Sequence, residues 1–495
     1  MLRLRPSLRF RPQRSHVALT ATLFLAGAAL AAGLAPPAPA DVPAGAPGDA
    51  IQLRPFLDES GAFTTFSTAG HVDLSNPFFK PLGSNGRTCQ TCHQPKFGWT
   101  ITPASARAVF EATGGRDPLF RTNDGTDSPE ADVSTLRARR HASSMLLSKG
   151  LIRVGLPLPA GAQFRLDDVD DPYGHAGPAD LSLFRRPLPT ANLSFLSTVM
   201  WDARENKFSD KSGPLILKDL AAQAADAISG HAQGTVGAVP PDVLQSIVTF
   251  ETGLFMAQVY DDRAGRLDLY GGLGGPLFLS HQEFHLGIND VLGADPSGMP
   301  FNPSAFTLYT AWADTDDRDN NRGHDRDRDY DRDYDRDDAR AAVARGEVLF
   351  NTKAIAITGV AGLNDALKTP LIPGTCTTCH DTPNAGNHSV ALPLNIGLAD
   401  ASRRTPDLPL YTLVNIATGE SVQTTDPGRA LLTGKWADIG KFKGATLRGL
   451  ATRAPYFHNG SVATLADAVT FYDTRFTIGL TKREKKDLVA FLRTL

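Results

Sequence analysis

The sequence predicts an all-α fold with two helical domains, long irregular inserts and an N-terminal extension. Two observations favour this class. Apolar residues recur at helical spacing in both halves of the 495-residue chain. Each half also contains one copy of the pattern Cys-x-x-Cys-His, at residues 89–93 and at residues 376–380. Because the two copies lie far apart, we expect one in each domain.

The pattern Cys-x-x-Cys-His is the attachment signature of c-type haem. The two thiols bond to the vinyl groups of the haem, and the imidazole of the next residue binds iron. The chain has four cysteines, and the two motifs use all of them. A zinc site or a redox dithiol would explain one Cys-x-x-Cys pair, but not a histidine directly after both pairs. The sequence therefore predicts two covalently bound haem c groups, held by Cys89, Cys92, His93, Cys376, Cys379 and His380.

The first 40 residues have the pattern of a secretory signal peptide. Residues 1–16 contain five arginines and no acidic residue, residues 17–35 are almost wholly apolar, and small residues precede the expected cleavage point before Asp41. An uncleaved membrane anchor is the alternative, but the apolar run ends in alanine and proline without an aromatic belt. We therefore expect a periplasmic or secreted protein that is not an integral membrane protein after cleavage.

The N-terminal haem c domain is predicted at residues 85–260, after an extended arm at residues 41–84 that is rich in proline, glycine, serine and threonine. Helices are expected at residues 134–149 and 215–228. A firmer helix is expected at residues 241–258, because proline stands at its start and apolar residues share one face. That face contains Val243, Leu244, Ile247, Val248, Leu254 and Phe255.

Residues 261–340 are predicted to form an irregular insert. Its last part, residues 314–340, mixes aspartate with arginine and contains Asp-Arg-Asp-Tyr twice. The pattern Asp-x-Asp-x-Asp at residue 325 begins like a calcium-binding EF-hand loop. However, Tyr330 stands where that loop needs glycine, and Arg336 where it needs a bidentate acid. We therefore interpret residues 314–340 as a solvated, disordered tract.

The C-terminal haem c domain is predicted at residues 341–495. Its first helix is expected at residues 341–351, where Gly346 would permit close contact with another helix. Its last helix follows a capping box at residues 481–484 and continues with an apolar stripe that ends at Leu495. We expect these two terminal helices to cross and to hold the second haem.

The second axial ligand of each haem decides much of its chemistry. The chain has five methionines, and none of them follows His380. The second haem therefore takes no methionine from its own domain. This argues against a plain electron carrier, whose high potential usually comes from His/Met ligation.

Residues 444–472 closely resemble the C-terminal haem domain of bacterial di-haem cytochrome c peroxidases and of MauG, the methylamine dehydrogenase maturation enzyme. The resemblance lies in Thr-Leu-Arg-Gly-Leu-Ala-Thr-Arg-Ala-Pro-Tyr-Phe-His-Asn-Gly-Ser at residues 446–461 and in the short helix that follows. In the peroxidases an axial methionine lies at the end of that helix, and in MauG a tyrosine takes its place. Tyr472 stands at the matching position. The resemblance thus implies that Tyr472 binds the second haem iron, where a phenolate stabilises oxidised iron.

The first domain resembles the same family. Residues 185–192 (Arg-Arg-Pro-Leu-Pro-Thr-Ala-Asn) are similar to the segment that precedes a Trp-Asp-Gly-Arg element, present here as Trp-Asp-Ala-Arg from Trp201. The resemblance implies that Trp201 lies between the two haems and relays electrons.

The family's peroxide pocket contains a glutamine, a proline and an acid. Gln223 matches the glutamine, although it lies farther from the tryptophan than usual, and Ala227 and Gln233 stand where the proline and the acid are expected. Loss of the acid would remove general acid/base help worth about 10² to 10⁴-fold. His231 and Asp226 are the candidate substitutes.

The resemblance bears on two further sites. His175 falls roughly where the peroxidases carry a displaceable ligand of the first haem, and His141 is the other candidate. The family binds one calcium ion between its domains through an asparagine and backbone oxygens. Arg186 stands at the asparagine position, while backbone donors near Arg453 and Pro455 are retained.

The first functional hypothesis is a periplasmic di-haem c-type oxidoreductase that activates hydrogen peroxide or oxygen at the N-terminal haem and passes electrons through Trp201. The electrons would come from a small electron-donor cytochrome, another redox protein or an organic substrate. A second hypothesis is a haem-dependent oxygenase that cleaves an apolar substrate, because the missing acid and the long inserts resemble the extracellular rubber oxygenases. A third is a non-catalytic di-haem electron-transfer cytochrome. A net charge of −3 points to no nucleic-acid partner.

Overall fold

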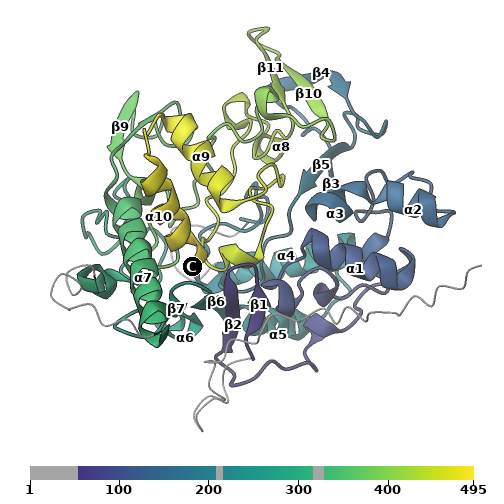
Figure 1. Ribbon diagram of the computed structural model, residues 1–495. Helices are drawn as coiled ribbons and strands as arrows, with labels where there is room; N and C mark the ends of the chain where they lie inside the picture. Colours follow the sequence, from purple (N-terminus) through teal and green to yellow (C-terminus); the bar gives the residue numbers. More distant parts are fainter. Residues whose placement is uncertain (1–53, 208–215, 316–327) are drawn as a thin grey trace, which may run out of the picture. The chain divides into compact units, whose positions relative to one another are not determined.

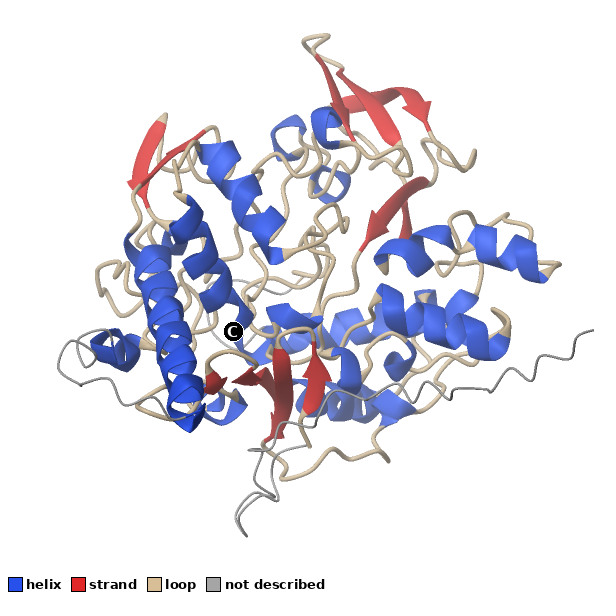
Figure 2. Ribbon diagram, viewed as in Figure 1, coloured by secondary structure: helices blue, strands red, loops and turns tan. Residues whose placement is uncertain are grey.

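The computed structural model describes residues 54–207, 216–315 and 328–495 (Figure 1). The predicted signal peptide at residues 1–40 lies outside this range. Helices account for 32% of the chain and strands for 16%, and the described strands form four antiparallel sheets (Figure 2). The prediction of an all-α fold is therefore wrong. Most of the strands are short, and two of the pairings, β2 with β6 and β4 with β10, join strands almost 200 or more residues apart, which no local periodicity predicts.

The largest sheet has the strand order β1-β2-β6-β7. Strands β1 (Phe56–Asp58) and β2 (Gly61–Ser67) come from the segment predicted to be an extended arm. Strand β6 (Leu254–Asp261) pairs with β2, and β7 (Gly265–Arg266) covers its other edge. The sheet therefore begins in one predicted region and ends in another.

The helix predicted at residues 241–258 is only partly correct. Helix α5 (Pro241–Thr252) begins at the expected proline, but the chain then enters β6. The apolar residues at 254 and 255 fit a helical face and a buried strand equally well, because β6 is buried on both faces. Pairing with β2 decides between the two structures.

The other sheets are small. Strand β10 (Leu410–Asn415) pairs with both β11 (Ser421–Thr424) and β4 (Phe164–Asp170), so this sheet contains residues from both predicted haem domains. Strand β3 (Ile152–Leu156) pairs with β5 (Leu181–Arg185). Strand β8 (Ile355–Thr358) pairs with β9 (Leu371–Gly374), and β9 leads directly into the second Cys-x-x-Cys-His motif.

The N-terminal helices are α1 (Pro103–Thr113), α2 (Leu136–Ala142), α3 (Ser144–Lys149) and α4 (Ile216–Gly230). Helix α4 confirms the helix expected at residues 215–228. The helix expected at residues 134–149 is instead divided into α2 and α3.

The carboxylate of Asp127 explains why the helix is divided between α2 and α3. This carboxylate accepts hydrogen bonds from the backbone N–H groups of Ser144 (3.0 Å) and Met145 (3.1 Å). It therefore caps a new helix start, as N-cap carboxylates do. Asp127 lies far enough upstream that the pattern of residues 134–149 does not contain the signal.

The C-terminal helices include α6 (Pro276–Ser280), α7 (Arg328–Thr352), α8 (Ala430–Thr433), α9 (Leu465–Phe476) and α10 (Lys482–Arg493). Helices α7 and α10 lie side by side (Figure 1). A Cβ atom on Gly346 would lie 2.0 Å from the carbonyl oxygen of Asp487, so glycine is required where the two helices meet.

Helix α7 begins inside the tract predicted to be disordered. From Arg328 onward the chain is helical, whereas residues 316–327 lie outside the described residues.

The capping box before α10 is confirmed: Glu484 N–H donates to Thr481 Oγ1 at 3.2 Å, and Thr481 N–H donates to Glu484 Oε2 at 2.7 Å. Among the helices of the described segments, none has the length and apolar content that a membrane crossing requires.

Candidate functional site

The two Cys-x-x-Cys-His motifs fold into the same short turn. Each begins with a 3₁₀ helix, at Cys89–Thr91 and at Cys376–Thr378. In both, the threonine before the first cysteine donates its N–H to the hydroxyl of the threonine three residues later, at 3.0 Å. The histidine N–H then donates to the carbonyl of the first cysteine, at 2.9 and 3.2 Å. The shared sequence Thr-Cys-x-Thr-Cys-His thus produces one local structure twice.

The two motif histidines also share their hydrogen bonding. His93 Nδ1 lies 3.2 Å from the carbonyl oxygen of Trp99, and His380 Nδ1 lies 2.7 Å from that of Gly386, six residues downstream in both cases. A carbonyl only accepts, so Nδ1 carries the proton and Nε2 keeps its lone pair. Burial lowers the pKa of His93 to about 4 and lowers the pKa of His380 as well. Both imidazoles are therefore neutral near pH 7, as metal ligation requires.

Each motif lies in the wall of its own cavity. The first cavity is lined by Cys89, Cys92 and His93. Its volume, counted as the space that the centre of a water molecule can occupy, is about 180 Å³. The second contains Cys376, Cys379 and His380, and the corresponding space is about 260 Å³. None of the four thiols is in a disulfide bond. Two thiols and a neutral imidazole are the groups through which a protein holds c-type haem, and a mainly apolar wall suits the porphyrin ring. The residues therefore fit one haem in each cavity.

The two cavities share a wall. Residues 186–189 line both, and so do Trp201, Lys443, Ala445 and Thr446. The indole Nε1 of Trp201 donates to the carbonyl oxygen of Arg186 at 2.7 Å, which fixes the ring in this wall. Trp201 therefore forms part of the wall of both cavities.

A buried ion-pair network holds the Trp201 loop in place. Arg185 pairs with Asp202 at 2.5 Å and with Asp426 at 2.7 Å, and the three side chains are at most 4% exposed. Burial alone would raise the pKa of Asp202, but the charges of Arg185 and Arg204 lower it to about 2. The loop that carries Trp201 is thus tied to residues more than 200 positions downstream in the sequence.

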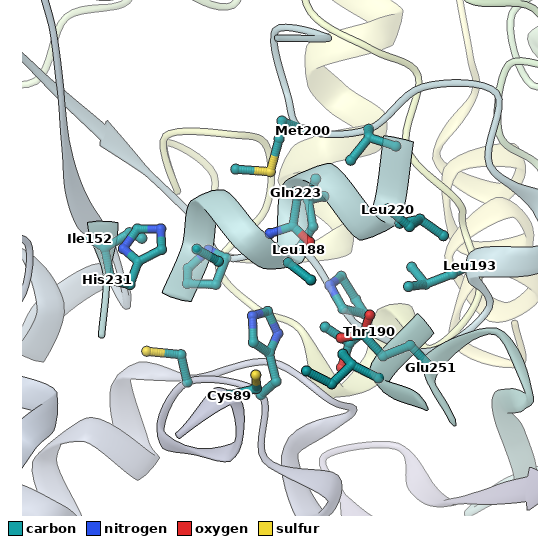
Figure 3. A pocket seen from close by; sticks show the side chains of 18 of the residues that line it. Cys89, Ile152, Leu188, Thr190, Leu193, Met200, Leu220, Gln223, His231 and Glu251 are labelled. Carbon is teal, nitrogen blue, oxygen red and sulfur yellow. The ribbon is translucent and has the colours of Figure 1, made fainter. Parts of the chain in front are cut away.

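Helix α4 forms part of the first cavity. Figure 3 shows Gln223 and Leu220 projecting from this helix above Cys89, with Glu251 on one side and His231 on the other. His231 follows the end of α4, and its Nδ1 contacts the carboxylate of Asp124, which also pairs with Arg87. The pKa of Asp124 is lowered, because His231 and Arg87 outweigh the effect of burial. The structure thus brings Gln223 and His231 to the same cavity.

Two further ionisable residues of these cavities were missed in the sequence. Glu251 lines the first cavity and is 5% exposed, and burial raises its pKa to about 8. The sequence did contain a signal for Glu251. It lies three residues after Val248 and four after Ile247, so it falls on the apolar face of the predicted helix. Lys443 lines both cavities, and burial, with a contribution from the charge of Arg453, lowers its pKa to about 7. It lies one residue before the segment that resembles MauG.

Tyr472 lies on α9 and lines the second cavity together with His380. Burial raises the pKa of its phenol, and the neighbouring thiols of Cys379 and Cys376 add to this effect. Among the described residues that line the second cavity there is no methionine.

Three other candidates are not among the residues that line the first cavity. The Nε2 atom of His175 pairs with Asp180 at 2.8 Å instead. His141 is exposed on α2. Asp226 is exposed and pairs with Lys207.

The candidate calcium position contains a guanidinium group. Arg186 donates from Nη2 to the carbonyl oxygen of Arg453 at 3.2 Å and from Nη1 to that of Lys149 at 2.9 Å. A side-chain cation therefore binds a carbonyl that the resemblance assigns to calcium.

No protein-family model matches the chain. The chain is 33% identical over 136 residues to the protein named cytochrome-c peroxidase IdrP1 of Denitromonas iodatirespirans, covering 24% of this chain and 36% of that protein. It is 32% identical over 124 residues to cytochrome c551 peroxidase of Nitrosomonas europaea, covering 24% and 30%. The chain thus spans only about a third of the length of these curated relatives.

These relatives confirm the resemblance to the cytochrome c peroxidases, and their names are those of peroxidase-type oxidoreductases. A crystal structure described as a MauG-like protein associated with microbial copper homeostasis aligns over 85% of this chain and 86% of its own. Its sequence identity is 16% and its TM-score is 0.36, a likeness too distant to carry an inference.

Proposed function

We propose that this protein is a di-haem oxidoreductase of the cytochrome c peroxidase type, with one c-type haem in each cavity. The observation that carries the proposal is the repeated site: two similar Cys-x-x-Cys-His turns, each placing an imidazole that is hydrogen-bonded through Nδ1 to a backbone carbonyl in the wall of its own cavity. When bound, haem supplies iron that exchanges single electrons and activates peroxide. The remaining roles belong to residues of the chain.

In the first cavity, His231 is the residue we propose for proton transfer. Reduction of hydrogen peroxide to two water molecules takes up two protons and two electrons. Asp124 fixes the orientation of the imidazole through Nδ1, which leaves Nε2 free to exchange a proton. Gln223 lines the same cavity and can hydrogen-bond to the oxidant through its amide. His231 would then replace the acid missing at residue 233.

In the second cavity, we propose that His380 and Tyr472 would both hold the haem iron when it is bound. Both residues line this cavity, and no methionine of the described lining competes with the phenol. Burial keeps the phenol protonated in the polypeptide alone, so ligation would require the positive charge of iron to release the proton.

Trp201 is the proposed route for electrons between the two sites. Its ring lies in the wall that both cavities share, and its hydrogen bond to Arg186 holds it there. The electrons would come from a small cytochrome or another redox protein outside the cytoplasmic membrane. At the candidate calcium position, the guanidinium of Arg186 already occupies the Arg453 carbonyl oxygen.

One observation favours a second candidate function, an oxygenase acting on an apolar substrate. Aliphatic side chains make up much of the wall of the first cavity and could contact such a substrate. They include Leu188, Leu193, Leu196, Val199, Leu220 and Ile247.

The test is peroxide-dependent oxidation of a reduced small c-type cytochrome by the haem-loaded protein. His231→Ala should lower kcat/KM for peroxide by about 10² to 10⁴-fold, the range for a lost general acid/base. His71→Ala, at an exposed position outside both cavities, should leave turnover unchanged. No turnover by the wild-type protein would refute the peroxidase proposal. Oxygen consumption with an apolar alkene, and no peroxide turnover, would instead favour the oxygenase.

A further inference from the structure

Asp290, Asp381 and His388 form a buried cluster that lies outside both haem cavities. Their side chains are 2%, 0% and 1% exposed, and one potential ligand atom from each lies within 4.8 Å of the others. Asp381 directly follows His380, and Asp290 belongs to the segment between α6 and α7. None of the three lines either cavity.

Several atoms of this region lack hydrogen-bond partners within the described part of the chain. His388 Nδ1 lies 3.1 Å from Asp381 Oδ2, a separation that two ligands of one ion can have. Within the described residues, Oδ1 of Asp290 is unpartnered. The same is true of three oxygens in the loop after His380, those of Thr382, Asn387 and Ser389. A buried unpaired polar atom costs about 1–3 kcal/mol, and a cation satisfies lone pairs of every one of these types.

The backbone holds the cluster in a fixed geometry. Asp381 Oδ1 accepts from the N–H of Ser389 at 2.7 Å, and Asp290 Oδ2 accepts from the N–H of Ala294 at 2.9 Å. The two loops also contact each other directly, because Asn289 Nδ2 donates to the carbonyl of Asp381 at 3.0 Å. Each carboxylate is therefore oriented by its own loop, as carboxylates of metal sites usually are.

We propose that Asp290, Asp381 and His388 bind one divalent first-row transition-metal ion, with zinc as the best-fitting probe. One imidazole nitrogen and carboxylate oxygens form a zinc-type donor set, and a water or a neighbouring hydroxyl would complete four-coordination. Calcium fits less well, because it takes six to eight oxygen ligands. A bound ion would join the loop around Asp290 to the residue after His380 and so hold the second haem-binding turn.

The test uses the full-length, tag-free, haem-loaded protein, dialysed against zinc and analysed for metal content. The wild-type protein should retain one zinc per chain. Asp290→Asn and His388→Gln should weaken zinc binding by about 100-fold or more, since even indirect partners of a site contribute 10 to 100-fold. Glu283→Gln removes an exposed carboxylate from the same segment and should leave zinc binding unchanged.

X-ray absorption at the zinc K edge of the wild-type protein gives a second measurement that does not depend on a variant folding. The proposal expects oxygen donors and one imidazole, with no sulfur. Less than one zinc per chain, sulfur ligation, or equal zinc binding by correctly folded Asp290→Asn would overturn the site. Haem content and circular dichroism of each variant identify a folding defect.

Discussion

Replacing Arg185 by methionine tests how firmly the wall between the two cavities is held. Arg185 is the common partner of Asp202 and Asp426, and the Trp201 loop is tied through it to the C-terminal part of the chain. Arg185→Met would leave two carboxylates, 2% and 4% exposed, without their shared cation. The variant should therefore be strongly destabilised.

The size of the effect follows from burial and from the pKa of Asp202. The lowering of that pKa from 3.8 to about 2 corresponds to about 2.5 kcal/mol of favourable interaction at neutral pH. Breaking a buried ion pair from one side typically costs about 3–5 kcal/mol, because the remaining charge stays buried. We therefore expect a loss of about 3–5 kcal/mol in the free energy of unfolding.

The loss should depend on pH. In the wild-type protein the folded pKa of Asp202 lies below its unfolded value, so its contribution is complete above about pH 4 and disappears as the pH falls toward 2. In Arg185→Met, burial should raise the pKa of Asp202 above its unfolded value, so the penalty appears as the pH rises. The difference between the two proteins should therefore be largest near pH 7 and smallest near about pH 2.

Guanidinium unfolding of the haem-loaded protein at several pH values measures this difference. Arg204→Met is the matched control, since Arg204 contacts the same carboxylate at 3.1 Å but is 17% exposed and leaves Arg185 in place. It should lose about 1 kcal/mol or less. A loss below about 1 kcal/mol for Arg185→Met, or one independent of pH, would mean that the buried Arg185 network does not stabilise the wall.

Three further predictions concern other parts of the chain. Gly346→Ala places a methyl group 2.0 Å from the carbonyl oxygen of Asp487 and should destabilise the protein by about 1–3 kcal/mol; an unchanged thermal midpoint would contradict the close contact of α7 with α10. Asp127→Ala removes the carboxylate that caps α3 and should cost about 1–2 kcal/mol in urea unfolding, and no loss would mean that the cap is unimportant. Tyr472→Phe should change the absorption of one haem and raise its reduction potential without changing haem content, whereas an identical spectrum would exclude ligation.

Local chemistry made part of the structure predictable. The two haem-attachment turns follow from six residues each, and α4 and the capping box before α10 follow from patterns within a single helix. The start of α5 follows from its proline. These features depend on neighbours in sequence.

The features that the sequence analysis missed depend instead on contacts between residues outside one local segment. Strand β6 forms because β2 pairs with it, and β2 is almost 200 residues upstream. The cap of α3 comes from Asp127, and His231 is oriented by Asp124, 107 residues away in sequence. No local window of sequence contains β6 together with β2, or His231 together with Asp124, so these contacts could not be derived without the fold.

We expect each of the two cavities beside Trp201 to hold one covalently attached haem. Mass spectrometry of the denatured protein tests this expectation most directly, because only thioether-bound haem survives denaturation. The wild-type protein should have a mass two haems above that of the polypeptide, and the double variant Cys376→Ser with Cys379→Ser should have a mass one haem above it. A wild-type mass with fewer than two haems, or an unchanged mass in the variant, would contradict this expectation.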